Sequence, residues 1–306
     1  MQQQVVADPY GSRTGSHWEI VGREDPVVGG GDDVYEGGHA LQAEQVKRFA
    51  RDGFHHAPAL YSEIQAGELL AEANRLAQAV AGPRPGVVIE PGSNVVRSLF
   101  RIHRTSDAFR AVAEDRRLLD VATQLLGSDV YIHQSRINFK PAFDGKEFFW
   151  HSDFETWHIE DGMPRMRAVS VSISLTDNNE FNGPLMVVPR SHHSYVRCVG
   201  ATPENHFEQS LKKQQYGVPS REAMCRLVER GGIAAPKGPP GSALFFDCNL
   251  MHGSGGNLSP YPRTNLFLVY NSVENALVEP FGDRPPRPEY LAERDFAPIG
   301  AARKPQ

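Results

Sequence analysis

The first half of the chain carries apolar residues at helical spacing. In residues 41–53, in 69–77 and in about 106–126, apolar side chains recur every three to four positions, which places them on one face of a helix. Gly53 and Gly127 follow the first and third segments, where a helix commonly ends at a left-handed glycine. The pattern predicts three amphipathic helices before the chain passes Gly127.

After Gly127 the apolar positions alternate, as in a strand with one packed and one polar face. Residues 130–140 and 169–176 show this most clearly. Their polar faces carry Gln134, Arg136, Asn138 and Lys140 in the first segment and Ser170, Ser172 and Ser174 in the second. Shorter strands are predicted at 185–188, 242–246 and 264–270, between turns rich in Gly, Pro and Asn. Helices followed by many short strands predict a mainly β fold, a β-sandwich or jelly roll decorated by N-terminal helices.

Residues 1–306 are expected to form a single domain, because no linker divides the middle of the chain. Residues 1–38 are polar and rich in Gly and Asp, so we expect a surface arm there. The proline-rich stretch 285–306 is expected to be an extended, flexible tail.

The charge balance narrows the choice of partners. The 32 Lys and Arg residues are interspersed with 37 Asp and Glu residues, which leaves no basic stripe for phosphates, so nucleic acid is not an expected partner. No signal peptide is recognisable and no stretch reaches the roughly 18 to 20 apolar residues of a membrane span, so we expect a cytoplasmic protein without membrane contact. Cys198, Cys225 and Cys248 form no CxxC motif and are expected to be reduced core residues.

His151 and Asp153 form the strongest candidate for a metal site. They stand two apart in an aromatic stretch, so in a strand both side chains would leave from one face. His252 follows the apolar strand that ends near Phe246 and could supply a third ligand. Two histidines and one carboxylate leave three open positions on an octahedral ion, the arrangement in which non-haem Fe(II) activates O2. We expect Fe(II) at this site, with room for a chelating oxoacid and for O2.

Spacing alone does not select this pair. Four His-x-carboxylate pairs occur, beginning at His17, His151, His158 and His206, whereas chance gives roughly 1.5. His151 could therefore be an ordinary buried histidine. The same three residues could also hold Zn²⁺ with a water molecule in a hydrolase, or a metal that only stabilises a non-catalytic, ligand-binding sandwich.

Arg263 stands 11 residues after His252, at the entry to a predicted strand. Its guanidinium could bind the distal carboxylate of an oxoacid in a two-bond fork that lysine cannot copy. The alternative is a surface arginine after a turn. The serine face of residues 169–176, together with Gln134 and Asn138, could add neutral hydrogen bonds inside a barrel.

The run from Phe149 to Asn178 resembles the signature stretch of ectoine hydroxylases. This is a branch of the phytanoyl-CoA dioxygenase-like superfamily of Fe(II)/2-oxoglutarate-dependent dioxygenases. The run contains Trp-His-Ser-Asp-Phe-Glu-Thr-Trp at 150–157, followed by His-Ile-Glu-Asp-Gly-Met-Pro-Arg-Met-Arg-Ala. Similar stretches lie at 8–13, 127–138, 181–185, 251–254 and 270–281, so the resemblance omits only about 14–40 and the tail beyond 285. It implies a double-stranded β-helix (jelly roll, cupin-like) core, Fe(II), 2-oxoglutarate, O2 and a homodimer.

Carried over position by position, the resemblance assigns three sets of residues. The metal triad falls on His151, Asp153 and His252. The 2-oxoglutarate contacts fall on Phe148, Asn138, Ser170, Ser254 and Arg263. The ectoine contacts fall on Gln134, Trp157, Phe246, Asn265, Phe267 and Arg284. The chain departs from the usual pattern at Arg190, where glycine is common, and at Gly11, where proline is usual, and neither is an assigned contact.

The implied reaction is hydroxylation of ectoine at carbon 5 with release of succinate and CO2, in a compatible-solute pathway for osmotic and temperature stress. Ectoine is a small ring with an amidinium cation and a carboxylate. Trp157, Phe246 and Phe267 would offer π faces to the cation, and Arg284 would pair with the carboxylate.

The implied mechanism needs no side-chain base. Glu155 and Asp161 are therefore assigned no catalytic role, although either could orient other groups of the site. The alternative reading is a related dioxygenase that acts on another small zwitterion or on an acyl thioester.

Overall fold

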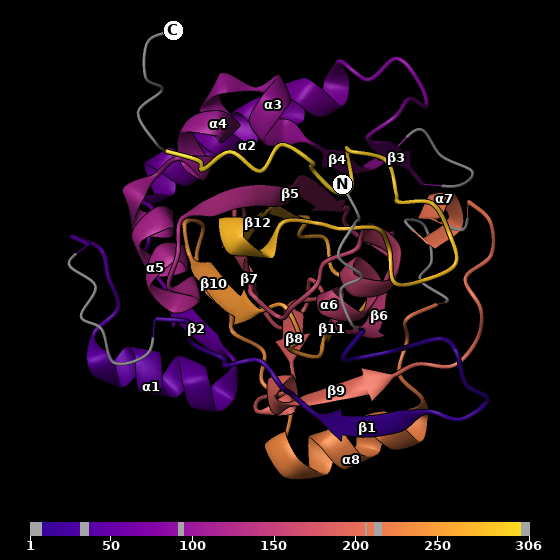
Figure 1. Ribbon diagram of the computed structural model, residues 1–306. Helices are drawn as coiled ribbons and strands as arrows, with labels where there is room; N and C mark the ends of the chain where they lie inside the picture. The colour runs from indigo at the N-terminus through magenta and orange to yellow at the C-terminus, as the bar shows by residue number, and fades with distance from the viewer. Residues whose placement is uncertain (1–7, 31–36, 91–94, 206, 211–215, 301–306) are drawn as a thin grey trace, which may run out of the picture.

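A seven-stranded antiparallel sheet forms the centre of the molecule (Figure 1), with the order β2–β10–β7–β12–β5–β4–β3. The computed structural model describes residues 8–30, 37–90, 95–205, 207–210 and 216–300. The strands of the large sheet are β2 (Phe54–Ala57), β3 (Val87–Ile89), β4 (Val96–Phe100), β5 (Val130–Lys140), β7 (Ala168–Ser174), β10 (Ala243–Asp247) and β12 (Arg263–Ser272).

A smaller sheet packs against the inner face of the large one. It consists of β6 (Phe148–His151), β11 (His252–Ser254) and β8 (Leu185–Val187) in the order β6–β11–β8. Leu185 and Val187 of the small sheet share an apolar cluster with Leu244, Phe246 and Phe267 of the large one. These packed antiparallel sheets confirm the predicted mainly β jelly-roll fold.

Helices cover the outer face of the large sheet (Figure 1). They are α1 (Ala43–Asp52), α2 (Glu63–Gln78), α3 (Ile102–Thr105), α4 (Asp107–Ala113) and α5 (Arg116–Leu126). Phe49, Leu69 and Leu118 from this layer join Val171 and Ile173 of β7 in the largest apolar cluster. Strand side chains alternate between faces, so the same packing turns the serines of β7 toward the small sheet.

The serine face is therefore interior rather than solvated. Ser170, Ser172 and Ser174 are at most 5% exposed. Antiparallel pairing sets Phe246 opposite Ser170 and Phe267 opposite Ser172, so these aromatic and hydroxyl side chains share one face of the large sheet. The space between the two sheets is lined by polar as well as apolar groups.

A third layer closes the other end of the molecule. β1 (Glu19–Gly22) pairs with β9 (Ser194–Arg197), and α8 (Arg221–Gly231) packs beneath this ribbon (Figure 1). The remaining short elements are α6 (Asp153–Thr156), the π-helix η1 (Trp157–Asp161), the 3₁₀ turns η2 (Ser191–His193) and η3 (Val273–Asn275), and α7 (Phe207–Ser210).

The predicted helix over 106–126 is wrong in one respect, because it is two helices. α4 ends at Ala113 and α5 begins at Arg116, since Asp115 adopts an extended conformation (φ −66°, ψ 127°). The carboxylate of Asp115 accepts a hydrogen bond from the backbone N–H of Arg117 and caps the new helix. A capping residue inside an apolar repeat thus starts a second helix.

The described parts of both chain ends, 8–30 and 285–300, combine exposed residues with buried ones that anchor them to the fold, whereas residues 1–7, 31–36 and 301–306 lie outside the described residues. Tyr10 is fully buried and Arg13 is 7% exposed, while Leu291 and Ala292 of the tail are fully buried. Cys198 and Cys248 are buried as predicted, but Cys225 is exposed on α8. Among the described residues, no helix has the length and apolarity needed to cross a membrane.

Gly162 ends the π-helix in a left-handed conformation (φ 81°). A Cβ atom at this position would overlap the backbone carbonyl of Val278. The glycine therefore allows both the backbone turn and the close approach of the chain that follows η3.

We predict that Gly162→Ala lowers the free energy of unfolding by at least about 2 kcal/mol, because it adds a steric clash to backbone strain. Gly200→Ala is the matched control, since Gly200 also has a positive φ (99°) but no atom lies within 4 Å of its Cβ position. Urea denaturation of both variants measures the difference. Equal losses would contradict a role for the contact with Val278.

Candidate metal centre

The two candidate histidines meet because the small sheet pairs them. His252, at the start of β11, lies directly opposite His151, at the end of β6, in the antiparallel register. Directly opposed residues project to the same face of a sheet. The two imidazole rings lie 4.2 Å apart, centroid to centroid.

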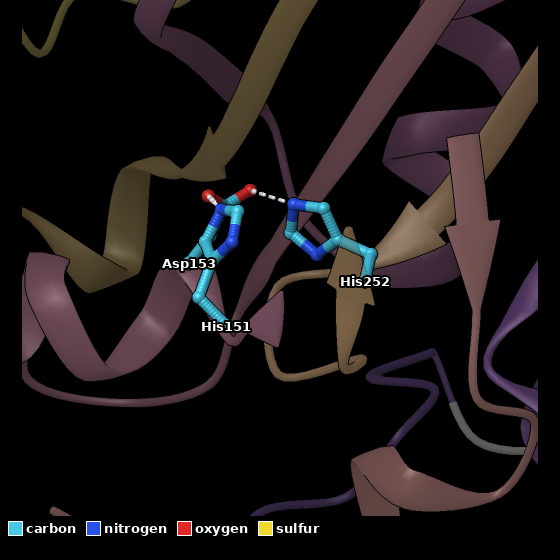
Figure 2. A group of neighbouring side chains, drawn as sticks. All are labelled: His151, Asp153 and His252. Carbon is cyan, nitrogen blue, oxygen red and sulfur yellow. Dashed lines mark ion pairs between the residues drawn. The ribbon is translucent and has the colours of Figure 1, made fainter. Parts of the chain in front are cut away.

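Asp153 reaches the same point from a helix rather than from the strand. β6 ends at His151, and Asp153 is the first residue of α6, so the prediction of one shared strand face is wrong. Its Oδ1 lies 3.5 Å from Nε2 of His151, and its Oδ2 lies 3.8 Å from Nε2 of His252 (Figure 2). One potential ligand atom from each residue falls within 4.8 Å of the others, which is close enough to bind a single ion.

Backbone contacts fix which nitrogen each histidine presents. Nδ1 of His151 lies 2.7 Å from the carbonyl oxygen of Phe149, and Nδ1 of His252 lies 2.9 Å from that of Leu250. A carbonyl oxygen can only accept a hydrogen bond, so each Nδ1 carries the proton. Each Nε2 then directs its lone pair toward the centre of the triad, as a metal ligand must.

Electrostatics favour the ligand forms of these side chains. Burial, together with neighbouring His151, lowers the pKa of His252 to about 4, which keeps its ring neutral. Burial opposes ionisation of Asp153, but His252, His151 and Arg136 outweigh it and hold the pKa of Asp153 well below its usual range. The neutral ring of His252, the ring of His151 and the ionised carboxylate of Asp153 form a donor set that fits Fe(II).

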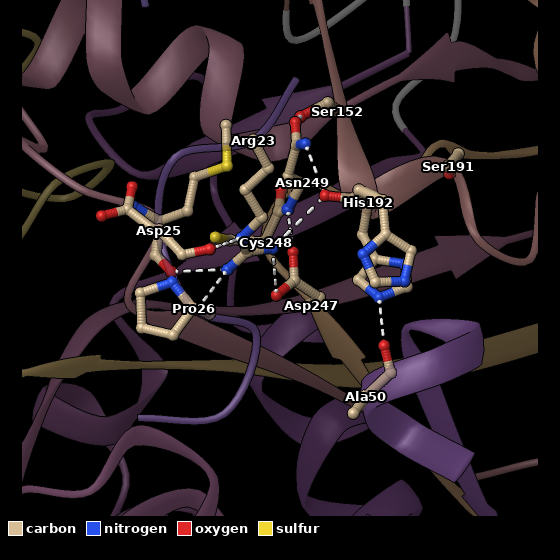
Figure 3. Close-up of polar contacts among 12 residues, drawn as sticks. Arg23, Asp25, Pro26, Ala50, Ser152, Ser191, His192, Asp247, Cys248 and Asn249 are labelled. Carbon is tan, nitrogen blue, oxygen red and sulfur yellow. Dashed lines mark hydrogen bonds and ion pairs between the residues drawn. The ribbon is translucent and has the colours of Figure 1, made fainter. Parts of the chain in front are cut away.

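A buried polar network braces the segments that carry the ligands (Figure 3). Ser152, between the first two ligands, donates a 2.9 Å hydrogen bond to the side chain of Asn249, three residues before His252. The backbone N–H of Asn249 donates to Asp247, which is paired at 2.8 Å with the buried Arg23. Asp153 itself accepts a 3.4 Å hydrogen bond from Ser170. These contacts limit the freedom of the triad before any metal binds.

The other His-x-carboxylate pairs do not form such a centre within the described residues. His17 is exposed, and His206 lies outside the described residues. His158 is buried, stacked on Phe154 and Phe281, and its Nε2 lies 2.9 Å from Asp8. Its ring is used in packing and in this ion pair.

A cavity opens beside the triad. Six residues assigned from the sequence line it: Gln134, Asn138, Phe148, His151, Asp153 and Trp157. The lining also includes three arginines and two hydroxyl groups, namely Arg97, Arg136, Arg287, Ser98 and Thr156. Phe246, whose ring lies 5.0 Å from that of His252, and Phe267 lie on the sheet face that adjoins this space.

Arg263 is a buried cation with no ion pair among the described residues. It is 4% exposed, and its Nε and Nη1 atoms have no hydrogen-bond partner among the described residues. Burial alone lowers its pKa to about 10. An unpaired buried guanidinium is costly unless a ligand anion completes it, so this residue marks an anion site.

Lys140 stands directly opposite Arg263 in the pairing of β5 with β12. Its Nζ donates a 2.9 Å hydrogen bond to Ser254 and another to the carbonyl of Gly255. Burial, followed by Arg263 and Arg97, lowers the pKa of Lys140 to about 6. A bound anion would favour the charged form of Lys140, so the opposed pair of Lys140 and Arg263 suits an anion of two negative charges.

Arg284, which the resemblance assigned to ectoine, does not line the cavity. It is exposed, and its Nε donates to the carbonyl of Thr202. Arg287, three residues later, lines the cavity instead and is held by Asp161 through two hydrogen bonds of 2.7 Å. Arg136 also lines it, over the ring of Phe267 at 5.0 Å. The sequence offered a signal only for Arg136, which lies on the polar face of its strand.

Three comparisons bear on this geometry. A family model described as phytanoyl-CoA dioxygenase (PhyH) matches residues 49–265. An ectoine dioxygenase of Bordetella bronchiseptica is 53% identical over 94% of this chain and 92% of its own length. The ectoine dioxygenase of Halomonas elongata is 49% identical over 93% of this chain and 86% of its own.

Solved structures show the same similarity. EctD from S. alaskensis, crystallised with 2-oxoglutarate and 5-hydroxyectoine, superposes with a TM-score of 0.86 at 46% identity and covers 98% of this chain and 99% of its own. The same protein was also crystallised with bound Fe. A carbocyclase, SnoK, shares the fold at a TM-score of 0.61 but only 17% identity, with 82% of this chain and 95% of its own covered.

We predict that His252→Ala abolishes stoichiometric Fe(II) binding, because only two of the three donors remain. His17→Ala, which removes an exposed imidazole, should bind Fe(II) like the unaltered protein. Anaerobic calorimetric titration with Fe(II) compares the two variants. Retained one-to-one binding in folded His252→Ala would contradict the assignment.

Proposed function

Because this chain belongs to the phytanoyl-CoA dioxygenase family, we propose that it is an Fe(II)- and 2-oxoglutarate-dependent ectoine hydroxylase. The reaction converts ectoine, 2-oxoglutarate and O2 into 5-hydroxyectoine, succinate and CO2. The proposal is carried by the His-Asp-His triad together with the buried guanidinium of Arg263, whose Nε and Nη1 have no hydrogen-bond partner among the described residues. A zinc hydrolase would leave that cation without a use.

His151, Asp153 and His252 would hold the iron. When bound, Fe(II) supplies the activation of O2 that is coupled to oxidative decarboxylation of 2-oxoglutarate. The residues of the chain orient the two organic substrates, exclude water and keep the ligands in their metal-binding protonation states.

2-Oxoglutarate is a dianion, and the buried cations near the triad suit its charge. The distal carboxylate would be bound by Arg263 in a fork, with Lys140 as the second cation and Ser254 as a neutral partner held by that lysine. Phe148, Asn138 and Ser170 complete the proposed cosubstrate site. Asn138 and Phe148 line the cavity, and Ser170 contacts Asp153.

Ectoine would occupy the part of the cavity bounded by Trp157. The aromatic faces of Trp157, Phe246 and Phe267 suit its amidinium cation. Gln134 and Asn265 would contribute side-chain amides. The amide of Gln134 donates to the carbonyl of Leu291, and that of Asn265 donates to the hydroxyl of Ser172. These contacts would leave one ring carbon facing the iron.

The carboxylate of ectoine would pair with Arg287, in place of the role predicted for Arg284. The fork with Asp161 uses Nε and Nη2 of Arg287 and fixes the guanidinium at the cavity wall. Arg136 adds a second cation, and its Nε lacks a hydrogen-bond partner among the described residues. A single carboxylate bound between them would be recognised by charge-assisted hydrogen bonds.

We further propose that the protein acts as a homodimer in the cytoplasm, in a pathway that supplies compatible solutes under osmotic and temperature stress, without nucleic-acid partners. The close relatives that carry the name ectoine dioxygenase support this physiological role. Light scattering on the purified protein measures the number of subunits.

The reaction itself is tested with the purified chain, loaded anaerobically with Fe(II) and 2-oxoglutarate. After O2 is admitted, ectoine should accelerate succinate formation, with one 5-hydroxyectoine formed per succinate. An acyl thioester or another small zwitterion should not replace ectoine. Succinate release that ectoine does not accelerate would overturn the substrate assignment.

We predict that 2-oxoglutarate affinity falls as pH rises above about 6. Lys140 is neutral above its pKa of about 6 in the ligand-free protein, and a bound dianion favours its charged form. Binding above this pH must therefore take up a proton, which weakens affinity by up to about tenfold per pH unit until the pKa of the complex is reached.

Calorimetric titration with 2-oxoglutarate from pH 6 to 8, anaerobically and at saturating Fe(II), measures this slope. Lys140→Met should bind more weakly at pH 6 and show a flatter pH profile. An unchanged slope in this variant would assign the titration to another group.

We predict that Trp157→Ala weakens ectoine binding by roughly thirtyfold, since a cation on a desolvated indole contributes on the order of 2 kcal/mol. Arg287→Lys should cost at least about tenfold because it replaces a planar fork with a point charge. Arg284→Lys is the matched control and should keep the affinity. The ratio of succinate to 5-hydroxyectoine should exceed one in the first two variants, and a ratio of one with unchanged affinity would remove both residues from the pocket.

A further inference from the structure

Arg13, in the N-terminal segment, is buried and conformationally strained. Its backbone has a left-handed φ of 59°, which is unfavourable for a residue other than glycine, and its side chain is 3% exposed. Its backbone N–H donates to the carbonyl of Cys198. Such a conformation persists only where the surrounding contacts hold it.

The guanidinium of Arg13 pairs with Glu155 and Glu160, which lie on either side of Trp157 in the sequence. Nε and Nη2 form a fork with Glu155, at 2.9 and 2.7 Å, and Nη1 donates to Glu160 at 2.6 Å. Nη2 also lies 3.4 Å from the hydroxyl of Thr156, which lines the cavity with Trp157. One side chain, 142 residues away in sequence from its first partner, thus spans the junction of α6 and η1.

The same contacts continue to the arginine proposed to bind the ectoine carboxylate. Oε2 of Glu160 lies 3.7 Å from Nε of Arg287, while Oε1 accepts from Arg13. The carboxylate of the next residue, Asp161, accepts two hydrogen bonds from the guanidinium of Arg287. Burial disfavours the charge of Arg287, yet Asp161 and Glu160 raise its pKa above the usual value. The π-helix therefore carries Trp157 at its first residue and the support of Arg287 at its last.

Two further contacts fasten the N-terminal segment to this helix. Asp8 lies 2.9 Å from Nε2 of His158, and Ser12 donates a 2.7 Å hydrogen bond to Glu155. The ring of Tyr10 packs edge-on against Phe154 at 5.2 Å. The segment from Asp8 to Arg13 follows the helix along α6 and η1 and does not contact His151 or His252 through any hydrogen bond described for it.

We propose that Arg13 is a positioning residue of the ectoine site. Through Glu155 and Glu160 it fixes the π-helix, so that Trp157 and Arg287 are held at the separation that a zwitterionic ring requires. The inference rests on the proposed function and extends it to the N-terminal segment, which would be part of the substrate-recognition machinery. A π-helical turn at a functional site fits this role, because such turns place side chains where an α-helix would not.

We expect Arg13→Lys to lose affinity for ectoine selectively. Lysine keeps the positive charge but cannot form the fork and the third bond together. The affinity for ectoine, measured calorimetrically on the anaerobic Fe(II) and 2-oxoglutarate complex, should fall by at least about tenfold, as small misplacements of orienting groups do. Fe(II) and 2-oxoglutarate affinities should change by less than about twofold, and the succinate to 5-hydroxyectoine ratio should rise above one.

Arg117→Lys is the matched control, since Arg117 also forms a fork, with Asp115, outside the site. It should leave the ectoine affinity and the product ratio unchanged. Glu160→Gln provides a second test that keeps the fork of Arg13 with Glu155 but removes the charge that pairs with both Arg13 and Arg287. It should weaken ectoine binding by about threefold or more, and it decides the question if Arg13→Lys does not fold.

The outcomes separate the two levels of the proposal. If the unaltered protein does not hydroxylate ectoine, the proposed function fails. If it does, and the folded variants lose ectoine, 2-oxoglutarate and Fe(II) affinity in parallel, or lose none, Arg13 only stabilises the fold and the inference is overturned.

Discussion

The pairing of β6 with β11 is the constraint on which the active centre depends. It sets His252 opposite His151 across only a few residues of antiparallel sheet. A shift of one residue would send one histidine to the other face and destroy the centre. Gly253 allows β11 to approach β6 closely, because a Cβ atom there would lie 3.1 Å from the carbonyl oxygen of Phe148. Asp153 is the first residue of α6, so its carboxylate reaches the two histidines from outside the sheet.

The buried cations differ in whether the folded chain supplies a carboxylate partner. Arg13, Arg23 and Arg287 are each paired with buried carboxylates at 2.8 Å or less. Arg263 and Lys140 oppose each other with no ion pair among the described residues, and the pKa values of both are lowered, although nearby Glu147 favours the charged form of Lys140. Burying charge without compensation costs stability. The protein therefore leaves charge uncompensated at the proposed cosubstrate site, whereas Arg287 stands at the proposed substrate site already paired with Asp161.

The sequence predicted the elements that have a local signal and missed what depends on distant partners. Alternation and turn signals correctly predicted β5, β7, β10 and β12 of the large sheet and the polar face of β5, but they did not predict β2, β3 and β4. They could not reveal that Asp115 caps a new helix or that Asp153 leaves its strand. The polar composition of residues 1–38 predicted a surface arm. It gave no sign that Arg13 is buried, because the carboxylates that pair with Arg13 lie more than a hundred residues downstream. No local pattern in the sequence pointed to Arg287, which lines the cavity three residues after Arg284.

The residues proposed to bind the metal and the cosubstrate, and those proposed to position the substrate, lie in different parts of the chain. The triad, Lys140 and Arg263 all lie within residues 49–265, the range shared with the wider family. Arg13 and Arg287 lie outside it, at opposite ends of the chain, yet both converge on the π-helix that carries Trp157. In the proposed arrangement the jelly roll holds the metal and cosubstrate sites, and the chain ends fold back to shape the substrate pocket. Since a jelly roll leaves its mouth open between two sheets, selectivity for a small zwitterion is most readily added by segments that can be exchanged without disturbing the metal centre.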